Sequence, residues 1–344
     1  MSGGGAMVEV VRGDLTEDRA GEILDFWSRS GALPGEAPRE RLPSVVCVAV
    51  DDAGEVVGVN SVEDRMAPTV GRRFWVYRRL VAEYSDDLAG AMFNAAFEAL
   101  AEEFEGGDAD PIGLCLAVED SETIARHPEA IWPETGLVFA GYLPDSRQLR
   151  LRYFRNATVG PGAFDASNID RLATRDYPVD DRFEIMPLAE SDSVTADDVL
   201  ALWSREGVVA DEVARRRIDQ VQLVAVADGS EVVGVSSTFL EQRPRLGVEL
   251  WNYRTFVASG FRHSSLAAQL LFGNLELLEG RFVSGEDTRA QGILFELENE
   301  DVMRGLNVAV WPQTGYTFIG ENTRGSHVRV RWFEGARIPP PQAD

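Results

Sequence analysis

The sequence predicts an α/β protein built from two tandem units, each a mixed and mostly antiparallel sheet flanked by helices. The length of 344 residues suits two domains of ordinary size. Apolar residues make up 44% of the chain, which is enough for a packed core in each unit. The same order of helices and strands also occurs twice at nearly constant spacing, which is typical of a duplicated domain.

The repeat is visible as short matching segments that keep the same order in both halves of the chain. The offset between matching segments grows only from 176 to 179 residues, which chance does not produce. The matches are Trp-Ser-Arg at 27–29 and 203–205, Glu-Val-Val-Gly-Val at 55–59 and 231–235, Leu-Ala at 88–89 and 266–267, and Trp-Pro-x-Thr-Gly at 132–136 and 311–315.

These matches define the domain organisation. We expect a first unit over residues 1–158, a linker over 159–181, a second unit over 182–338 and a frayed polar tail over 339–344. The linker is rich in Gly, Pro, Asp and Ser, which favour turns and flexible connections over packed structure.

Within each unit, hydrophobic periodicity predicts a helix, a hairpin of strands, an aromatic strand, a long helix, a further strand, a short helix and two closing strands. In the first unit the helices are expected at 20–29 and 87–103, and the strands at 45–50, 56–61, 74–81, 113–118, 138–142 and 148–154. In the second unit the helices are expected at 196–205 and 264–278, and the strands at 222–227, 232–239, 248–257, 292–297, 317–320 and 328–333.

The turn after the second unit's aromatic strand carries a chemical pattern. Arg262 follows Val257 by five residues, and Ser265 and Ala267 come next at intervals of three and two. The free N–H groups at the start of the following helix attract anions, and small side chains let a phosphate approach the backbone. The pattern resembles the acyl-CoA signature of the GNAT superfamily of N-acetyltransferases, although Ser265 stands where that signature has its first glycine.

The resemblance extends to the order of elements in both halves. It implies two GNAT-like (acyl-CoA N-acyltransferase) domains, with acetyl-CoA or another acyl-CoA as the donor. The implied cofactor-binding residues are Phe256, Val257, Arg262, His263, Ser264, Ser265, Leu266, Ala267 and Asn299. The matching turn of the first unit has no Arg and carries Glu83, Asp86 and Asp87, which would repel a pyrophosphate. We therefore expect the first unit to be degenerate and the second to hold the cofactor.

Candidate catalytic residues follow from the same resemblance. A Glu on the strand before the signature often serves as general base in this superfamily, and the matching position is Trp251. Glu249 lies two residues earlier on the same face and is the candidate base, with a solvated carboxylate as the alternative. Tyr253 shares that face and could bind a substrate, or it could belong to an aromatic core.

The residue that would protonate the leaving thiolate is unusual. The family's tyrosine lies about four residues before the glycine of the last turn, where this chain has Trp311 and, in the first unit, Trp132. An indole cannot act as a phenol does, so Tyr316 is the substitute candidate.

Composition limits the partners. The net charge of −24 argues against DNA and tRNA surfaces. It is compatible with a cationic amine acceptor, with generic acidic solubilisation as the alternative. No run approaches the ~18 apolar residues of a membrane span, so we expect no membrane partner.

Cys47 and Cys115 lie in apolar strands and suggest buried free thiols of a cytoplasmic protein. His127, His263 and His327 have no metal-ligand spacing, so no metal is expected.

The leading hypothesis is an acyl-CoA-dependent N-acyltransferase that acts on a small amine through its second unit. One alternative is an aminoacyl-tRNA-dependent transferase, which fits the lost glycine and the missing tyrosine but not the charge. The other is a non-catalytic GNAT-like binding protein, which the tryptophans at both tyrosine positions favour. The acceptor, the acyl group and the oligomeric state are not assigned by the sequence.

Overall fold

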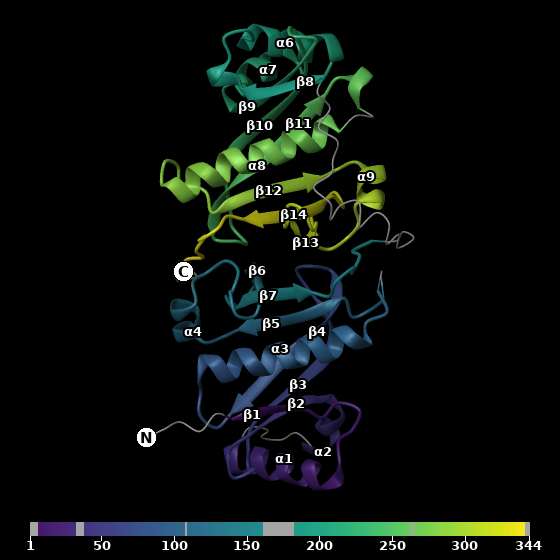
Figure 1. Ribbon diagram of the computed structural model, residues 1–344, viewed down its shortest axis with the longest axis vertical. Coiled ribbons are helices and arrows are strands. Elements are labelled where there is room, and N and C mark those ends of the chain that lie inside the picture. The colour runs from purple at the N-terminus through teal and green to yellow at the C-terminus, as the bar shows by residue number, and fades with distance from the viewer. Residues whose placement is uncertain (1–5, 32–37, 107–108, 161–181, 263–264, 341–344) are drawn as a thin grey trace. The chain divides into compact units, whose positions relative to one another are not determined.

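The computed structural model describes residues 6–31, 38–106, 109–160, 182–262 and 265–340 (Figure 1). The chain divides into two compact units, and the division along the sequence falls near residue 164. The expected linker lies, from residue 161 onward, outside the described residues. Each unit is described below on its own.

The first unit contains one seven-stranded sheet in the order β1-β2-β3-β4-β5-β7-β6. β4 and β5 are parallel, and the neighbouring pairs are antiparallel. Its elements are β1 (Met7–Val10), α1 (Glu17–Ser30), α2 (Pro38–Arg41), β2 (Val45–Val50), β3 (Val56–Ala67), β4 (Arg72–Val81), α3 (Asp86–Glu103), β5 (Gly113–Val118), α4 (Ser121–Arg126), β6 (Val138–Tyr142) and β7 (Gln148–Tyr153).

The second unit repeats this topology in a sheet of order β8-β9-β10-β11-β12-β14-β13, where β11 and β12 are the parallel pair. Two mixed sheets with flanking helices confirm the α/β fold class expected for a tandem protein. The elements are β8 (Phe183–Pro187), α6 (Ala196–Glu206), α7 (Asp211–Arg217), β9 (Val221–Ala227), β10 (Glu231–Arg243), β11 (Val248–Val257), α8 (Leu266–Ser284), β12 (Gly292–Leu297), α9 (Glu300–Gly305), β13 (Thr317–Glu321) and β14 (His327–Trp332).

The duplicated helices begin and end on duplicated local signals. Thr16 caps α1 by accepting a hydrogen bond from the Arg19 N–H, and Thr195 forms a capping box with Asp198 at the start of α6. Both helices end at a left-handed glycine, Gly31 in α1 and its counterpart in α6. Local sequence therefore specifies these helices in both units.

Several helix and strand boundaries in the structure differ from those expected from the sequence. β3 continues to Ala67, beyond the expected end at residue 61, because residues 62–67 keep pairing with β4. α8 extends from Leu266 to Ser284, beyond the expected end at residue 278, and the left-handed Gly285 ends it, whereas the expected start at residue 264 lies outside the described residues. The short edge strands β1 and β8 were not predicted, because so few residues carry no clear period.

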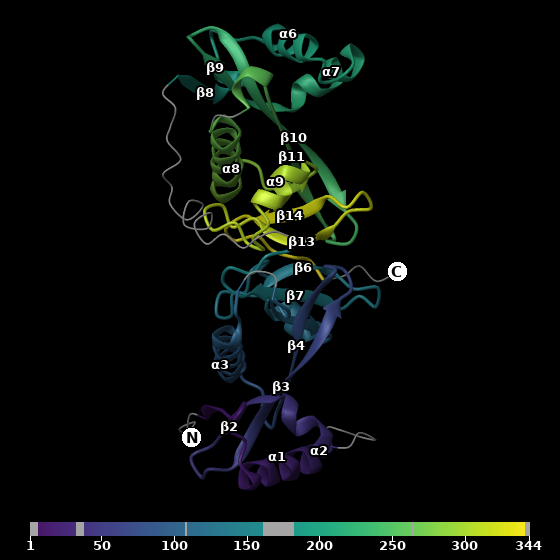
Figure 2. The same cartoon turned by 90° about the vertical axis from the view of Figure 1, so that its right-hand side faces the viewer.

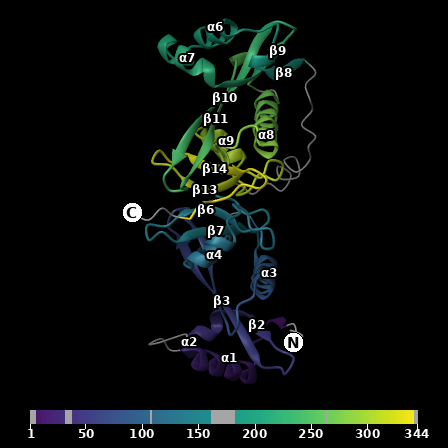
Figure 3. The ribbon, with the colours of Figure 1, turned by 90° about the vertical axis from the view of Figure 1, so that its left-hand side faces the viewer.

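One core cluster of the first unit lies between its sheet and α3, which covers one face (Figure 2), and a second lies between the sheet and α1. α8 covers one face of the second sheet in the same way (Figure 3). Cys47 and Cys115 are buried free thiols, as expected. Burial raises the pKa of Cys47 to about 11 and that of Cys115 to about 12, so both thiols stay protonated at neutral pH.

No helix among the described residues is long and apolar enough to cross a membrane. No group of three or more His, Cys, Asp or Glu side chains there is arranged to hold a metal ion.

Candidate functional site

The parallel strand pair of each unit separates soon after it forms. β4 and β5 pair only at Trp75 with Leu114 and at Val76 with Cys115. In the second unit, β11 and β12 pair only from Trp251 to Tyr253. Beyond these points the inner edge of the longer strand has no strand beside it in the described structure, and the strand leads to the N-terminus of the long helix. Each unit therefore contains a wedge with free backbone groups along one side.

In the first unit this wedge is a cleft with a volume of about 610 Å³. Its walls come from β4, β5, α3, α4 and the turn at 132–136. Tyr77, Phe93 and Trp132 provide aromatic surface, and the Trp132 indole N–H donates to the His127 carbonyl oxygen at 3.0 Å. This hydrogen bond fixes the turn against the end of α4, so the cleft has a preformed wall.

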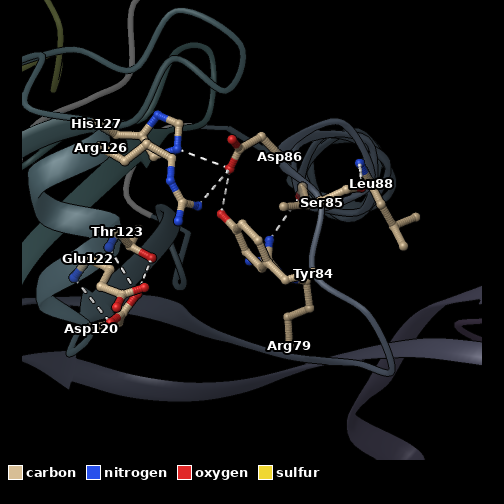
Figure 4. A network of polar contacts seen from close by, with 11 residues as sticks. Arg79, Tyr84, Ser85, Asp86, Leu88, Asp120, Glu122, Thr123, Arg126 and His127 are labelled. Carbon is tan, nitrogen blue, oxygen red and sulfur yellow. Dashed lines mark hydrogen bonds and ion pairs between the residues drawn. The ribbon is translucent and has the colours of Figure 1, made fainter.

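The N-terminus of α3 at the mouth of the cleft is occupied by a carboxylate of the chain itself (Figure 4). Asp86 accepts a hydrogen bond from the Tyr84 hydroxyl at 2.7 Å and lies 3.0 Å from His127 Nε2 and 3.8 Å from Arg126. The Tyr84 hydrogen bond, with help from His127, lowers the pKa of Asp86, so it is charged at neutral pH. A phosphate at this helix end would therefore meet a fixed negative charge.

Two further carboxylates on the rim are not compensated. Among the described residues, the side chains of Asp87 and Glu134 have no hydrogen bond or ion pair, although both line the cleft. Three arginines also line the cleft: Arg147 pairs with Glu119 at 2.7 Å, Arg79 donates to the Ala89 carbonyl oxygen at 3.0 Å, and Arg78 lies 3.8 Å from Glu63. The lining carboxylates outnumber them, and they are Asp86, Asp87, Glu119, Asp120 and Glu134. The cleft of the first unit thus has a negative rim.

The second unit has neutral residues at most of these acidic positions. The repeat offsets place Ser265 at the position of Asp87, Gln313 at that of Glu134 and Asn299 at that of Asp120. The last equivalence is visible in the structure, because Asp120 caps α4 and Asn299 caps α9 in the same way. The first turn of α8 holds no acidic residue, whereas that of α3 holds two. The end of α8 therefore suits an anion and the end of α3 does not.

The interior of the second wedge is more aromatic. Phe295 and Tyr316 stand where the first unit has the cleft-lining residues Leu116 and Leu137. The Phe295 ring packs against Tyr253 at 5.5 Å and against Tyr316 at 6.2 Å, measured between centroids. Tyr316 is fully buried, and its hydroxyl has no hydrogen-bond partner among the described residues. Burial raises the Tyr316 pKa far above its usual value, so the phenol is neutral.

The predicted cofactor residues lie around the end of β11 and the start of α8. Phe256 and Val257 end the strand, and Arg262 is exposed, with its Nε 3.4 Å from the Val257 carbonyl oxygen. Leu266 packs in the core, so only its backbone can face a ligand, whereas Ala267 is exposed. His263 and Ser264 lie outside the described residues.

The other two predicted cofactor residues make local hydrogen bonds. Ser265 Oγ accepts from the Gln269 side chain at 2.7 Å. Asn299 Oδ1 accepts from two backbone N–H groups at the start of α9, so this residue is the N-cap of that helix. Its side-chain oxygen is therefore already used within the chain.

The predicted catalytic residues are only partly brought together. Tyr253 and Tyr316 both touch Phe295, at the end of the parallel pairing. Glu249 is exposed near the start of β11, opposite Gln242 on β10. It lies four residues before Tyr253, which is about 13 Å along a strand. Glu249 thus stays a candidate base without direct contact to the tyrosine pair.

The cleft of the first unit was missed by sequence reasoning, which expected only a degenerate copy. The signal was present in the residue pairs Asp87/Ser265, Glu134/Gln313 and Asp120/Asn299, where one unit is acidic and the other is neutral and similar in shape. The volume of the cleft could not be predicted from the sequence, because it depends on how far the parallel strands separate.

Comparisons with known proteins bear on the fold. No protein-family model matches the chain, and no curated protein does. Among solved structures, a GNAT-family acetyltransferase from Streptococcus pneumoniae is 13% identical, covers 44% of this chain and 99% of its own, and has a TM-score of 0.32. A GNAT-family acetyltransferase from Brucella melitensis in complex with acetyl-CoA is 15% identical, covers 47% and 93%, and has a TM-score of 0.30.

A third match covers more of the chain. It is a GCN5-related glucosamine N-acetyltransferase region of a fungal multi-domain β-N-acetylglucosaminidase, 14% identical over 82% of this chain and 35% of that one, with a TM-score of 0.27. Each of the two units contains one seven-stranded mixed sheet.

Proposed function

We propose that this protein is an acyl-CoA-dependent N-acyltransferase that uses acetyl-CoA or a related donor, acts on a small amine and holds the donor in its second unit. The observation that carries the assignment to the second unit is the charge at the two helix ends. α8 starts without acidic residues and next to Arg262, whereas α3 starts with Asp86 and Asp87.

The residues around α8 match the chemistry of the donor. The first backbone N–H groups of the helix and the exposed Arg262 guanidinium would hold the pyrophosphate. Residues 254–257 of β11 pair with β10 on one side only, so their other edge is free to hydrogen-bond the amides of the pantetheine arm. The arm would then lead the thioester toward Tyr253 and Tyr316.

Acyl transfer needs an amine held against the thioester carbonyl carbon, and positioning supplies much of the rate. As the C–N bond forms and the C–S bond breaks, the amine loses a proton and the thiolate gains one. In this proposal the hydroxyl of Tyr316, whose ring lies beside Phe295 at the end of the parallel pairing, donates a proton to the sulfur. Glu249 would take the amine proton only through intervening water, because of its distance along β11.

A non-catalytic acyl-CoA-binding protein is the second candidate, and the tryptophans favour it. The Trp311 indole N–H donates to the Leu306 carbonyl oxygen at 3.1 Å, as Trp132 does to His127 in the first unit. These indoles hold the turn against the short helix and replace the phenol at that position. Binding without turnover is the outcome that separates this candidate from the enzyme.

The test of the proposal is calorimetric titration of acetyl-CoA into the protein and into the Arg262→Glu variant. We expect binding in the micromolar range, weakened at least tenfold in the variant because a cation near the phosphates becomes an anion. Arg216→Glu on α7, an exposed arginine of the same unit, is the matched control and should bind like the parent.

Two outcomes contradict this proposal. Absence of heat with acetyl-CoA and with longer acyl-CoA donors excludes the donor class, and consumption of aminoacyl-tRNA would then favour the tRNA-dependent alternative. If the Arg262→Glu and Arg216→Glu variants bind acetyl-CoA with equal affinity, the donor site does not lie at the start of α8. Because the chain contains no lysine, thioester loss in such assays does not come from lysine self-acylation.

Replacing Tyr316 by Phe separates its structural and chemical roles. The variant removes a buried hydroxyl that has no partner, so we expect the second unit to gain about 1 kcal/mol in unfolding free energy. If the hydroxyl protonates the leaving sulfur, kcat falls about a hundredfold while the Kd for acetyl-CoA stays unchanged. An unchanged kcat would show that Tyr316 is not the acid.

A further inference from the structure

The cleft of the first unit has a different chemistry from the proposed donor site. We propose that this cleft binds a small organic cation, an aliphatic amine or diamine, between its aromatic wall and its acidic rim. The inference does not depend on acyl transfer by the second unit, because every residue that carries it belongs to the first.

The size and lining of the cleft suit a small molecule. Its volume of about 610 Å³ lies within the range of pockets that enclose such ligands. Phe93 and Leu116 from facing elements, with the ring of Trp132, provide apolar surface for a carbon chain. The Tyr77 side chain also lines the cleft and is 2% exposed.

The charge of the rim selects the class of ligand. Asp87 and Glu134 are the lining carboxylates without a partner in the described structure. Five carboxylates line the cleft against three arginines, which are Arg78, Arg79 and Arg147, so the balance of charge is negative. Two carboxylates that lack partners attract one or two ammonium groups and repel an anion.

These two carboxylates belong to the same part of the rim. Gly90 lies one helical turn after Asp87, on the same side of α3. A Cβ atom on Gly90 would come within 3.8 Å of the Glu134 Cβ, so this side of α3 faces the turn that carries Glu134. A single ligand can therefore meet both carboxylates.

The duplicated unit supports a specific role for this pair. Ser265 and Gln313 occupy the matching positions of the second unit, so the fold accepts neutral side chains there. Asp86, by contrast, is bound to Tyr84, His127 and Arg126 in the first unit and excludes a phosphate from the same mouth. At these positions the first unit carries more negative charge than the second, as a site for a cation requires.

The experiment is calorimetric titration of 1,4-diaminobutane into the full chain without any acyl-CoA, with succinate as a dianion of similar length. The test variant is Asp87→Ser with Glu134→Gln, which installs the second unit's residues. The control is Asp52→Asn with Glu55→Gln, which removes two exposed charges of the same unit outside the cleft. We expect the diamine Kd to rise at least tenfold in the test variant, to stay within twofold in the control, and succinate not to bind.

A second variant keeps both carboxylates and places a larger side chain in the space beside them. Gly90→Leu adds a side chain toward Glu134, and loss of diamine binding with an unchanged circular dichroism spectrum supports the site. Three results overturn it: no diamine or monoamine binding by the parent chain, equal losses in the cleft and control variants, or equal binding of succinate. Because no acyl-CoA is present, any of these leaves the proposed transferase activity untouched.

Discussion

Installing the first unit's acidic pair in the second unit, as Ser265→Asp with Gln313→Glu, is expected to weaken acetyl-CoA binding about a hundredfold. Ser265 immediately precedes α8 and Gln313 lies in the turn that follows α9, at positions whose counterparts line the first unit's cleft. Two added charges near a pyrophosphate cost about 3 kcal/mol together at the effective dielectric of a protein surface, which corresponds to the stated factor.

The measurement is the Kd for acetyl-CoA by calorimetry, at two salt concentrations. The control variant, Ser230→Asp with Gln242→Glu, adds the same charge at exposed positions of the second unit away from α8. We expect the control to lose less than threefold, and the loss in the test variant to shrink as salt rises. Equal losses in both variants would mean that net charge, rather than the end of α8, governs binding.

The second large effect concerns a glycine that both units keep at the start of β5 and β12. A Cβ atom on Gly292 would lie 2.3 Å from the Arg331 carbonyl oxygen and 3.1 Å from the Trp332 Cα, both backbone atoms of the paired strand β14. Gly113 has the same constraint against Arg152 in the first unit. Gly292→Ala therefore forces β12 and β14 apart, and we expect it to destabilise the second unit by about 3 kcal/mol.

Urea unfolding followed by circular dichroism measures this effect. Gly280→Ala on α8 is the matched control, because a Cβ atom there meets nothing within 4 Å. Alanine at an unobstructed helical position is expected to stabilise by about 0.5 to 1 kcal/mol. A loss of less than about 1 kcal/mol in Gly292→Ala would show that the strands adjust to the added methyl group at low cost.

Much of the fold was predictable because its signals are local and occur twice. β2, β5, β6, β11 and β12 have the bounds that the sequence predicts. β1 was not predictable, because four residues carry no period of their own and become a strand only by pairing with β2. The length of β3 was underestimated for the same reason, since its polar end is held by β4.

The candidate site was predictable in chemistry but not in shape. Arg262 and Ser265 could be placed around the start of the second unit's long helix from their resemblance to the acyl-CoA signature, and the acidic Asp86 and Asp87 around the start of α3. The effect of these residues on the site depends on contacts between segments that are far apart in the sequence. Asp86 meets His127, 41 residues away, and the cleft beside it exists because β4 and β5 separate after two paired residues.

The sequence by itself therefore determined the duplication, the order of elements and the difference in charge between the two helix ends, because each is written in neighbouring residues or in a fixed offset. Only the tertiary structure decided that the wedge of the first unit is open and that Phe295 and Tyr316 pack into that of the second. The physical reason is that volume and burial depend on side chains from several elements at once. No local pattern records how those side chains meet.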